Sequence, residues 1–439
     1  MRFFAKRTLI TLLVTLLYVI EYHHVYKEFV YTYFSYSDIH YFDINFTQYY
    51  ELLMMAVFPV VFYRGSVNLA SLFSFFTYLF VYIPFVDALF VAGLPSSITF
   101  AYGLTFLVCM CMMFISDKLC LGKKLFIRGK KKMPFSTFEI ISVFLIVVCV
   151  ASNINNMSFV NFFAEDNDLY ERRAMYHSSS MAKIVFYIVS WLAHFILPFL
   201  AVIYYRAKNY WKVIIVLFCS IIMYMINMQK ASLAIPFLSM LGYAGYSYWK
   251  KLNSSYLHVY VMILVGLLSY LLFINSSSPI YFGLAVVFIM RTQCIEGMQL
   301  DRYMNFFEVH NNPVTHYTHI GVVNTLTGAY PYGDASIGQM VAGDGSNSNA
   351  TFWLMDGVAA EGVLGVIFVT VLFIIMKGYV NSIGIKYNYV ACFFTMVYVI
   401  TSFMNTSLFT SIITGGLIIA YLTYAYVEMP SLSGKATEQ

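Results

Sequence analysis

Charged residues are the first thing that this sequence lacks. Asp, Glu, Lys and Arg make up 11% of its 439 residues, whereas a soluble globular domain carries roughly 25%. Hydrophobic residues reach 60%, and the mean hydropathy is +0.73. The 38 tyrosines and 41 phenylalanines suit a protein with many membrane–water interfaces, where aromatic rings settle. This balance excludes an ordinary soluble domain and predicts a polytopic membrane protein.

Sequence motifs for nucleotides and for common hydrolases are missing as well. The chain has no Walker loop, no Rossmann glycine fingerprint, no H-E-x-x-H and no G-x-S-x-G. It has no CxxC pair, and only Cys294 of its seven cysteines falls in a segment predicted to be external. One external cysteine cannot form an intrachain disulfide. We therefore expect no cofactor, no nucleic-acid partner and no use of ATP or nucleotide sugars inside the cell.

Long apolar runs are abundant, and a membrane span needs about 20 mostly apolar residues. The first run follows a basic start without an A-x-A-like cleavage site, so we expect an uncleaved span. The sequence predicts an all-α polytopic membrane protein with about twelve transmembrane helices, near 8–20, 49–63, 67–90, 98–116, 137–153, 181–205, 213–228, 231–249, 256–275, 363–380, 387–404 and 407–427.

Lysine and arginine give the predicted orientation. With the N-terminus inside, 19 of the 26 Lys and Arg residues fall in cytoplasmic segments, as the positive-inside rule expects. Both termini are then cytoplasmic. Helices one to nine occupy residues 1–275, with external loops at 21–48 and 154–180. A large external loop at 276–362 follows, and residues 363–439 hold helices ten to twelve and the cytoplasmic tail.

Of the seven basic residues on the predicted outer side, four are singled out as candidates: Arg172, Arg173, Lys230 and Arg291. A guanidinium offers fixed donors that match phosphate oxygens, so these residues are candidates for holding a lipid phosphate or diphosphate. The alternatives are local pairing with neighbouring acids for the two adjacent arginines, and snorkelling to the headgroups for Arg291. Lys230, at a tight turn, fits an interfacial anchor equally well.

Histidines cluster in the stretch HNNPVTHYTHIG, as His310, His316 and His319. Imidazole is a common general base for a hydroxyl proton, so His316 is a candidate catalytic residue. The three-residue spacing to His319 also fits two metal ligands on a helix, but Pro313 and nearby β-branched residues disfavour a helix. No third ligand has recognisable spacing, so we expect no metal site. Surface or packing roles for all three histidines remain open.

The stretch Ser346–Gly365, SNSNATFWLMDGVAAEGVLG, carries amides, aromatics and two carboxylates into the tenth predicted span. Asp356 and Glu361 are five residues apart, about 140° around a helix, which argues against a paired-carboxylate site. Asp356 stays a candidate base, whereas Glu361 fits a cap at the entry to the span.

The amides and aromatics of the same stretch offer hydroxyl partners and flat apolar faces, which a sugar-binding surface requires. Asn347, Asn349 and Trp353 are therefore candidate sugar-binding residues. A Ser or Asn cap on the following helix is the alternative role, and it is compatible with sugar binding.

These features together resemble the Wzy-type O-antigen and capsular polysaccharide repeat-unit polymerases. The family's N/S-x-N-A-x-F pattern, followed by an acid and a small-residue entry to a span, matches Asn347, Asn349, Ala350, Phe352, Asp356, Gly357 and the run 361–365. The segment from Arg291 through Asp301 and Tyr303 to Phe307 resembles the opening of the family's large loop. The sequence-level similarity covers roughly residues 285–370, and the chain has Lys230 where related patterns often show arginine.

The resemblance implies an enzyme of the bacterial cytoplasmic (inner) membrane. Such a glycosyltransferase joins undecaprenyl-diphosphate-linked oligosaccharides, its donor and acceptor, into O-antigen or capsular polysaccharide at the outer face, without a metal. Implied roles are diphosphate binding by Arg172, Arg173, Lys230 and Arg291, proton acceptance by His316 or Asp356, and sugar contacts by the amide-rich stretch. Membrane lipids, flippases and chain-length regulators are the implied partners.

Two other functions fit the sequence. An O-antigen ligase-like enzyme shares the donor but uses a different acceptor. A lipid-linked oligosaccharide flippase or transporter predicts short loops, inverted halves and charges buried inside spans, where Asp87 and His194 are the main polar residues.

Overall fold

The computed structural model describes residues 2–37, 39–117, 132–155, 157, 183–248, 254–343 and 347–429. Across these ranges the chain is helical and contains no strand; its one isolated bridge joins Met133 and Val427. The all-α prediction is therefore confirmed. The chain forms two compact units, and each is assembled from separate stretches of sequence.

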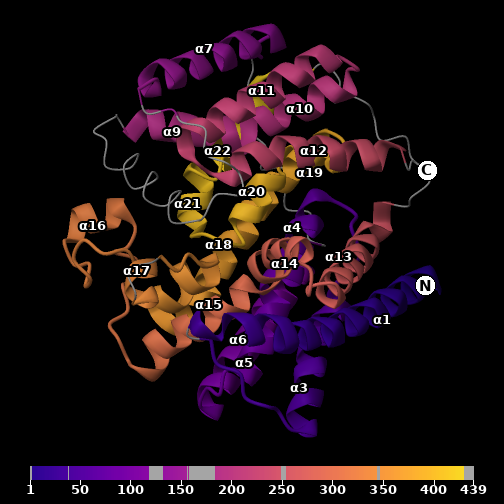
Figure 1. The fold of residues 1–439 in the computed structure, drawn as a ribbon, viewed down its shortest axis with the longest axis vertical. Coiled ribbons are helices and arrows are strands. Elements are labelled where there is room, and N and C mark those ends of the chain that lie inside the picture. The colour runs from indigo at the N-terminus through magenta and orange to yellow at the C-terminus, as the bar shows by residue number, and fades with distance from the viewer. Residues whose placement is uncertain are drawn as a thin grey trace. The chain divides into compact units, whose positions relative to one another are not determined.

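Unit 1 comprises Met1–Cys120, Asn253–Lys377 and Phe403–Leu408. Short 3-10 or π-helical turns carry the label η, and α18 continues beyond Lys377 into the other unit (Figure 1). The elements of unit 1 are α1 (Arg2–Val25), η1 (Tyr26–Tyr31), α2 (Thr32–Phe34), η2 (Ser35–Ser37), α3 (Phe46–Val57), η3 (Phe58–Phe62), α4 (Leu69–Thr77), η4 (Tyr78–Tyr82), α5 (Ile83–Val91), α6 (Ser96–Ser116), η7 (Ser254–Tyr256), α13 (Leu257–Ile274), α14 (Pro279–Ala285), η8 (Val286–Cys294), α15 (Ile295–Met304), η9 (Asn305–Val309), α16 (Gly321–Thr327), α17 (Ile337–Ala342), η10 (Trp353–Val358) and α18 (Ala359–Lys386).

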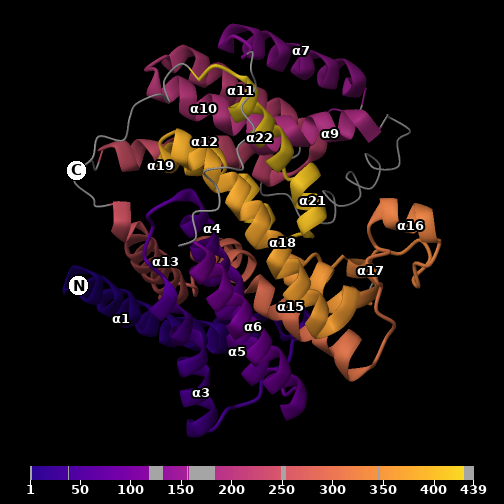
Figure 2. The same ribbon diagram turned by 180° about the vertical axis from the view of Figure 1, so that it is seen from behind.

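Unit 2 comprises Leu121–Leu252, Gly378–Ser402 and Phe409–Gln439. Within it α10, α11 and α12 pack against one another, and they lie side by side in both Figure 1 and Figure 2. The elements are α7 (Phe135–Asn153), α9 (Lys183–Trp191), η6 (Leu192–Ile196), α10 (Leu197–Arg206), α11 (Tyr210–Asn227), α12 (Lys230–Tyr248), α19 (Tyr389–Thr395), α20 (Val397–Ser402), α21 (Leu408–Ile413, from the end of unit 1) and α22 (Leu417–Tyr426).

The core of unit 1 is the helix formed by α4, η4 and α5. Its residues are apolar on every side, which is the pattern of a helix enclosed by others. Leu79 and Phe85 have no exposed surface, and the helix packs against α3, α6 and α15. This central helix positions the elements that carry the candidate site, because α6 and α15 both rest on it.

Two prolines inside apolar helices explain two of the π-helical turns. Proline lacks an N–H and its ring clashes with the carbonyl four residues earlier, so it disturbs a regular α-helix. Pro84 follows η4 and Pro198 follows η6. In each case the residue before the proline donates to the carbonyl five residues back, as in Ile83 to Tyr78. The wider turn accommodates the ring, and the helix continues.

Ten helices among the described residues are long and apolar enough to cross a bilayer, by length and composition. Nine of them match predicted spans, so the membrane-type helical architecture is confirmed. The predicted spans near 49–63, 231–249 and 387–404 are not among the ten: the first is a shorter apolar helix, and the third is divided into α19 and α20. The count of twelve and the sidedness stay predictions.

The tenth such helix, Pro279–Val309, lies inside the predicted external loop. The ring centroid of Phe282 lies 5.7 Å from that of Phe29, at the end of the first long helix. Nineteen residues later, Asp301 Oδ2 accepts a hydrogen bond of 2.8 Å from the backbone N–H of His40. Nineteen helical residues extend about 28 Å, close to the thickness of the hydrocarbon core. Between these two contacts the Tyr18 hydroxyl, in the first predicted span, donates to Gln293 Oε1 at 3.3 Å. The predicted external loop therefore contains a further candidate span.

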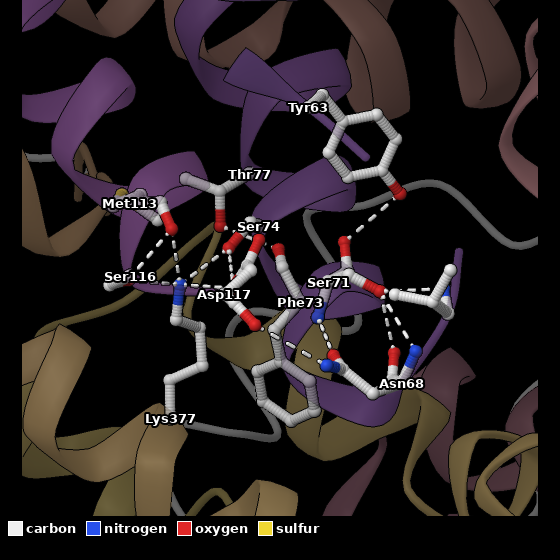
Figure 3. Close-up of polar contacts among 11 residues, drawn as sticks. Tyr63, Asn68, Ser71, Phe73, Ser74, Thr77, Met113, Ser116, Asp117 and Lys377 are labelled. Atoms are coloured by element: carbon white, nitrogen blue, oxygen red, sulfur yellow. Dashed lines mark hydrogen bonds and ion pairs between the residues drawn. The ribbon is translucent and has the colours of Figure 1, made fainter. Parts of the chain in front are cut away.

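A buried ion pair joins three helices of unit 1 (Figure 3). Lys377 Nζ of α18 lies 2.6 Å from Asp117 Oδ1, at the end of α6, and both side chains are buried. The ammonium also donates to Ser74 Oγ of α4 at 2.7 Å, to the Met113 carbonyl at 2.7 Å and to Ser116 Oγ at 3.0 Å. A buried charge is tolerated only when it is paired and hydrogen-bonded, and this ammonium meets both conditions.

Replacing Lys377 by Met alone leaves Asp117 buried without its cation, so we expect a loss of about 3–5 kcal/mol in the free energy of unfolding. The double variant Lys377→Met, Asp117→Leu removes both charges and should recover most of that loss. Denaturant or thermal unfolding of the purified protein in detergent measures both. Equal destabilisation of the single and double variants would contradict a role for charge pairing.

Candidate functional site

The helix that begins the tenth predicted span is broken near its start. Glu361 has φ −152° and Gly362 has φ +60° with ψ −135°, and neither pair of angles is helical. The backbone angles of Gly362 are essentially restricted to glycine. The break takes the carbonyl groups of Ala359 and Ala360 out of the helical hydrogen-bond pattern, so they need other donors.

The loop that contains the clustered histidines supplies those donors. The backbone N–H of Thr315 donates to the Ala359 carbonyl at 2.8 Å, and that of His316 donates to the Ala360 carbonyl at 3.1 Å. His316 and Tyr317 both have positive φ, of 46° and 62°, so this loop is locally strained. Residues 311–320 form no regular helix, as Pro313 and the β-branched residues predict.

The pinned loop places His316 against Glu361. His316 Nδ1 lies 2.7 Å from Glu361 Oε1, and the side chains are 68% and 38% exposed. A carboxylate accepts hydrogen bonds, so Nδ1 carries the proton, and in neutral imidazole Nε2 then holds the lone pair. A histidine whose tautomer is held by a carboxylate, with the opposite nitrogen open to solvent, is the arrangement of a general base.

Asp356, the other predicted candidate base, has a different environment. Its side chain has no exposed surface and binds His319 Nε2 at 3.0 Å and Ser407 Oγ at 2.7 Å through Oδ1. Its Oδ2 accepts from the backbone N–H of Leu408 at 2.5 Å. His319 Nδ1 in turn lies 2.9 Å from Thr315 Oγ1. With these partners and no access to solvent, Asp356 anchors the histidine loop and is not placed to take a proton from a substrate.

Two further polar side chains lie against the break. Glu308 of η9 accepts a hydrogen bond from the Tyr102 hydroxyl of α6. A Cβ atom built on Gly362 would lie 3.2 Å from that hydroxyl oxygen and 3.4 Å from Glu308 Oε1. We call His316, Glu361, Glu308 and Tyr102 the helix-break cluster. It joins α6, η9, the histidine loop and the start of α18.

Tyr317 lies next to the base candidate. Burial, together with the nearby carboxylates of Glu361 and Asp356, raises the pKa of its phenol to about 12. The phenol therefore keeps its proton at neutral pH and cannot serve as the base.

The described part of the amide-rich segment, 347–351, has no regular secondary structure, and the backbone N–H of Asn349 donates to the Asn347 carbonyl at 3.2 Å. Asn347 and Asn349 are exposed, as predicted for sugar-binding residues, whereas Ser348 between them is buried. Ser348 Oγ accepts from Arg302 Nη1 at 2.7 Å, and its carbonyl accepts from the Tyr303 hydroxyl at 3.2 Å. Arg302 was not among the predicted diphosphate ligands, yet it is the cation that the structure brings to this segment.

Trp353 does not present a face to solvent. It has no exposed surface, its ring packs 5.4 Å from that of Phe106, and Nε1 donates to Thr370 Oγ1 at 2.8 Å. An indole enclosed in this way cannot stack on a sugar, so its predicted sugar-binding role is corrected to a core role. The helix turn η10 also starts without a side-chain cap, and the predicted Ser or Asn cap is absent there.

The predicted diphosphate ligands lie in different parts of the chain. Arg291 lies in η8 with an exposed side chain, and Lys230 begins α12 in unit 2. Arg172 and Arg173 lie outside the described residues. No group of three or more metal-ligating side chains occurs in the described part of the chain, and the absence of a metal from the reaction stays a prediction.

The sequence does not mark four residues of the site for these roles: Glu361, Glu308, Tyr102 and Arg302. Glu361 was assigned to a cap, although its neighbour Gly362 signals a backbone position that a regular helix cannot hold. Glu308 and Arg302 lie among ordinary polar residues of the large loop, and no spacing marks them. Their contacts depend on the fold.

Comparisons of the chain with protein-family models, with curated proteins and with solved structures found no match.

Replacing Gly362 by Ala forces a side chain onto a positive φ, so we expect a loss of about 1–3 kcal/mol in the free energy of unfolding. Gly283→Ala is the matched control, because no atom lies within 4 Å of its added Cβ and its φ is not positive. That helical site should gain about 0.5–1 kcal/mol. Thermal unfolding in detergent compares the two variants. Equal unfolding midpoints for Gly362→Ala and Gly283→Ala would contradict the helix break at Gly362.

Proposed function

We propose that the protein is a membrane-embedded glycosyltransferase that joins undecaprenyl-diphosphate-linked oligosaccharide repeat units into O-antigen or capsular polysaccharide. The observation that carries the proposal is the pairing of His316 Nδ1 with Glu361 Oε1 at 2.7 Å, with the imidazole 68% exposed. The exposed amides of Asn347 and Asn349, in the same unit, support it as hydroxyl partners. The apolar helices suit a lipid-linked substrate.

The proposed reaction needs one proton acceptor and one stabilised leaving group. The acceptor sugar's hydroxyl oxygen forms a bond to the anomeric carbon of the donor, and its proton passes to His316 Nε2. The bond from that carbon to the diphosphate oxygen breaks, and the diphosphate leaves with the electron pair. Fixed cations stabilise such a leaving group. Within unit 1, the proposal assigns this role to the predicted ligand Arg291 and adds Arg302 to it. The roles of Arg172, Arg173 and Lys230 stay predictions from the sequence.

The proposed site faces the outer side of the bacterial cytoplasmic membrane. The predicted external loops hold His40, Asp301 and His316, and two of these residues are in contact: His40 Nδ1 lies 3.0 Å from Asp301 Oδ2. In the same unit, Lys377 of α18 pairs with Asp117, which follows α6, and the charge bias assigns Lys377 to the cytoplasmic side. These groupings support the proposed topology.

A transporter of lipid-linked oligosaccharides is the second candidate. The specific observation in its favour is that charged groups are buried within apolar helices of unit 1. Besides Lys377 and Asp117, His23 Nδ1 lies 2.7 Å from Asp87 Oδ1, with side chains 13% and 2% exposed. Ionisable groups inside spans often mark transport pathways. His194, the other intramembrane candidate, binds the Thr414 carbonyl and Gln229 in unit 2.

Deletion of the gene separates these candidates. Loss of a polymerase should reduce the surface-glycan ladder to the core plus one repeat unit. Loss of even that single repeat would indicate a flippase or a ligase and would contradict polymerisation. Electrophoresis of the surface glycan, with the gene restored on a plasmid as the control, gives the answer.

His316→Ala removes the proposed base, and we expect the polymerisation rate to fall by about 10²–10⁴-fold. Glu361→Gln should lower the rate in the same direction, because the amide no longer selects the tautomer. His310→Ala is the matched control, since this exposed histidine binds the Asn305 carbonyl instead. Chain elongation in proteoliposomes, at equal protein, measures the rate. Full activity of the His316 variant would exclude it as the base.

A further inference from the structure

A groove opens in unit 1 between α3 and α6, and no member of the helix-break cluster lines it. It has a volume of about 800 Å³, within the range of ligand-binding cavities. Figures 1 and 2 show α3, α5 and α6, which form its walls, next to one another. Its lining falls on one face of each long helix, with Gln48, Glu51, Met54 and Met55 on α3 and Ser96, Thr99, Phe100, Leu104 and Leu107 on α6.

Two glycines allow close packing beside the groove. A Cβ atom on Gly103 would lie 2.8 Å from Met55 Cε, so this glycine lets α3 and α6 approach each other. Gly93, with φ +69°, packs against Phe42, and a Cβ atom there would lie 2.4 Å from Phe42 Cε2. The lining runs along both helices to residues 42–44 and 93–96, which are predicted to be external, and we call this end the mouth.

The walls are apolar and exposed. Met54 is 50%, Phe100 is 73% and Leu104 is 48% exposed. All three belong to apolar helices, and α6 is long enough to cross the bilayer. At that depth the groove meets lipid rather than water, so a hydrocarbon chain is the physically expected occupant.

Acidic side chains at the mouth favour a lipid whose headgroup carries a cationic group. Asp43 and Glu51 line the groove, and no Lys or Arg does. Asp43 Oδ1 already holds an ammonium group, Lys27 Nζ, at 2.7 Å. Glu51 is exposed, and Gln48, Ser96 and Thr99 add hydrogen-bonding groups beside it. Carboxylates at the mouth repel a diphosphate and attract an ammonium group.

We propose that this groove binds a phospholipid with a primary-amine headgroup, of the phosphatidylethanolamine type, with one acyl chain between α3 and α6 and the amine at Glu51. This site is separate from the proposed catalytic cluster and does not depend on the proposed function. The protein then binds a bulk membrane lipid preferentially at the surface formed by the second and fourth predicted spans, which correspond to α3 and α6.

Native mass spectrometry of the full-length protein in mild detergent, equilibrated with equimolar phosphatidylethanolamine and phosphatidylglycerol, tests the site. The wild type should retain phosphatidylethanolamine in preference. Leu104→Trp fills the groove and should lower its occupancy about tenfold, since an acyl chain loses contact for two or so methylenes. Met54→Trp fills the groove from the opposite wall, and we expect the same result. This second variant tests the proposal if Leu104→Trp does not fold.

Leu264→Trp is the matched control, because Leu264 is 66% exposed on α13 and does not line the groove. Its lipid occupancy should equal that of the wild type. Glu51→Gln should reduce the preference for phosphatidylethanolamine by about two- to fivefold, as expected for one exposed ion pair. Equal retention of both lipids by the wild type, unchanged occupancy in both tryptophan variants of the groove, or displacement of the amine lipid by undecaprenyl phosphate would each overturn the proposal.

Discussion

Every backbone polar group in an apolar environment needs a hydrogen-bond partner within the protein. The helix break at Glu361–Gly362 creates this need at one place in the chain. The break leaves two carbonyl groups that the helix itself no longer uses. Thr315 and His316 satisfy them through backbone N–H groups, and this docking brings His316 beside Glu361. The candidate base therefore depends on an irregular backbone that glycine permits, and the catalytic hypothesis and the fold share one cause.

The same break rests on close glycine contacts in the motif that precedes the span. A Cβ atom on Gly365 would lie 2.2 Å from the carbonyl oxygen of Gly357, and one on Gly357 would lie 2.9 Å from Val366 Cγ2. The π-helical turn η10 thus lies directly against the first turns of α18. Asp356, within that turn, ties it to Ser407 and to His319. A residue that looks catalytic in sequence holds the loop on which the exposed histidine sits.

Buried charged pairs also hold the helices of unit 1 together. Lys377 with Asp117 and His23 with Asp87 each join helices that are distant in sequence. Such pairs cost desolvation, and their retention in apolar surroundings is better explained by specificity or function than by stability alone. They are compatible with a transferase whose helices must hold a defined arrangement around a lipid-linked substrate, and they are also the feature that a transporter would need.

Sequence by itself determined the all-α character, the positions of nine long apolar helices, the irregular histidine loop and the exposed amides of Asn347 and Asn349. Each of these follows from composition, run length or local backbone preference, which act within a few turns of chain. Tertiary structure alone decided that Trp353 is core, that Asp356 is enclosed, that Glu361 pairs with His316 and that Arg302 meets Ser348. Burial and long-range pairing depend on which helices pack together, and neither period nor spacing encodes that choice.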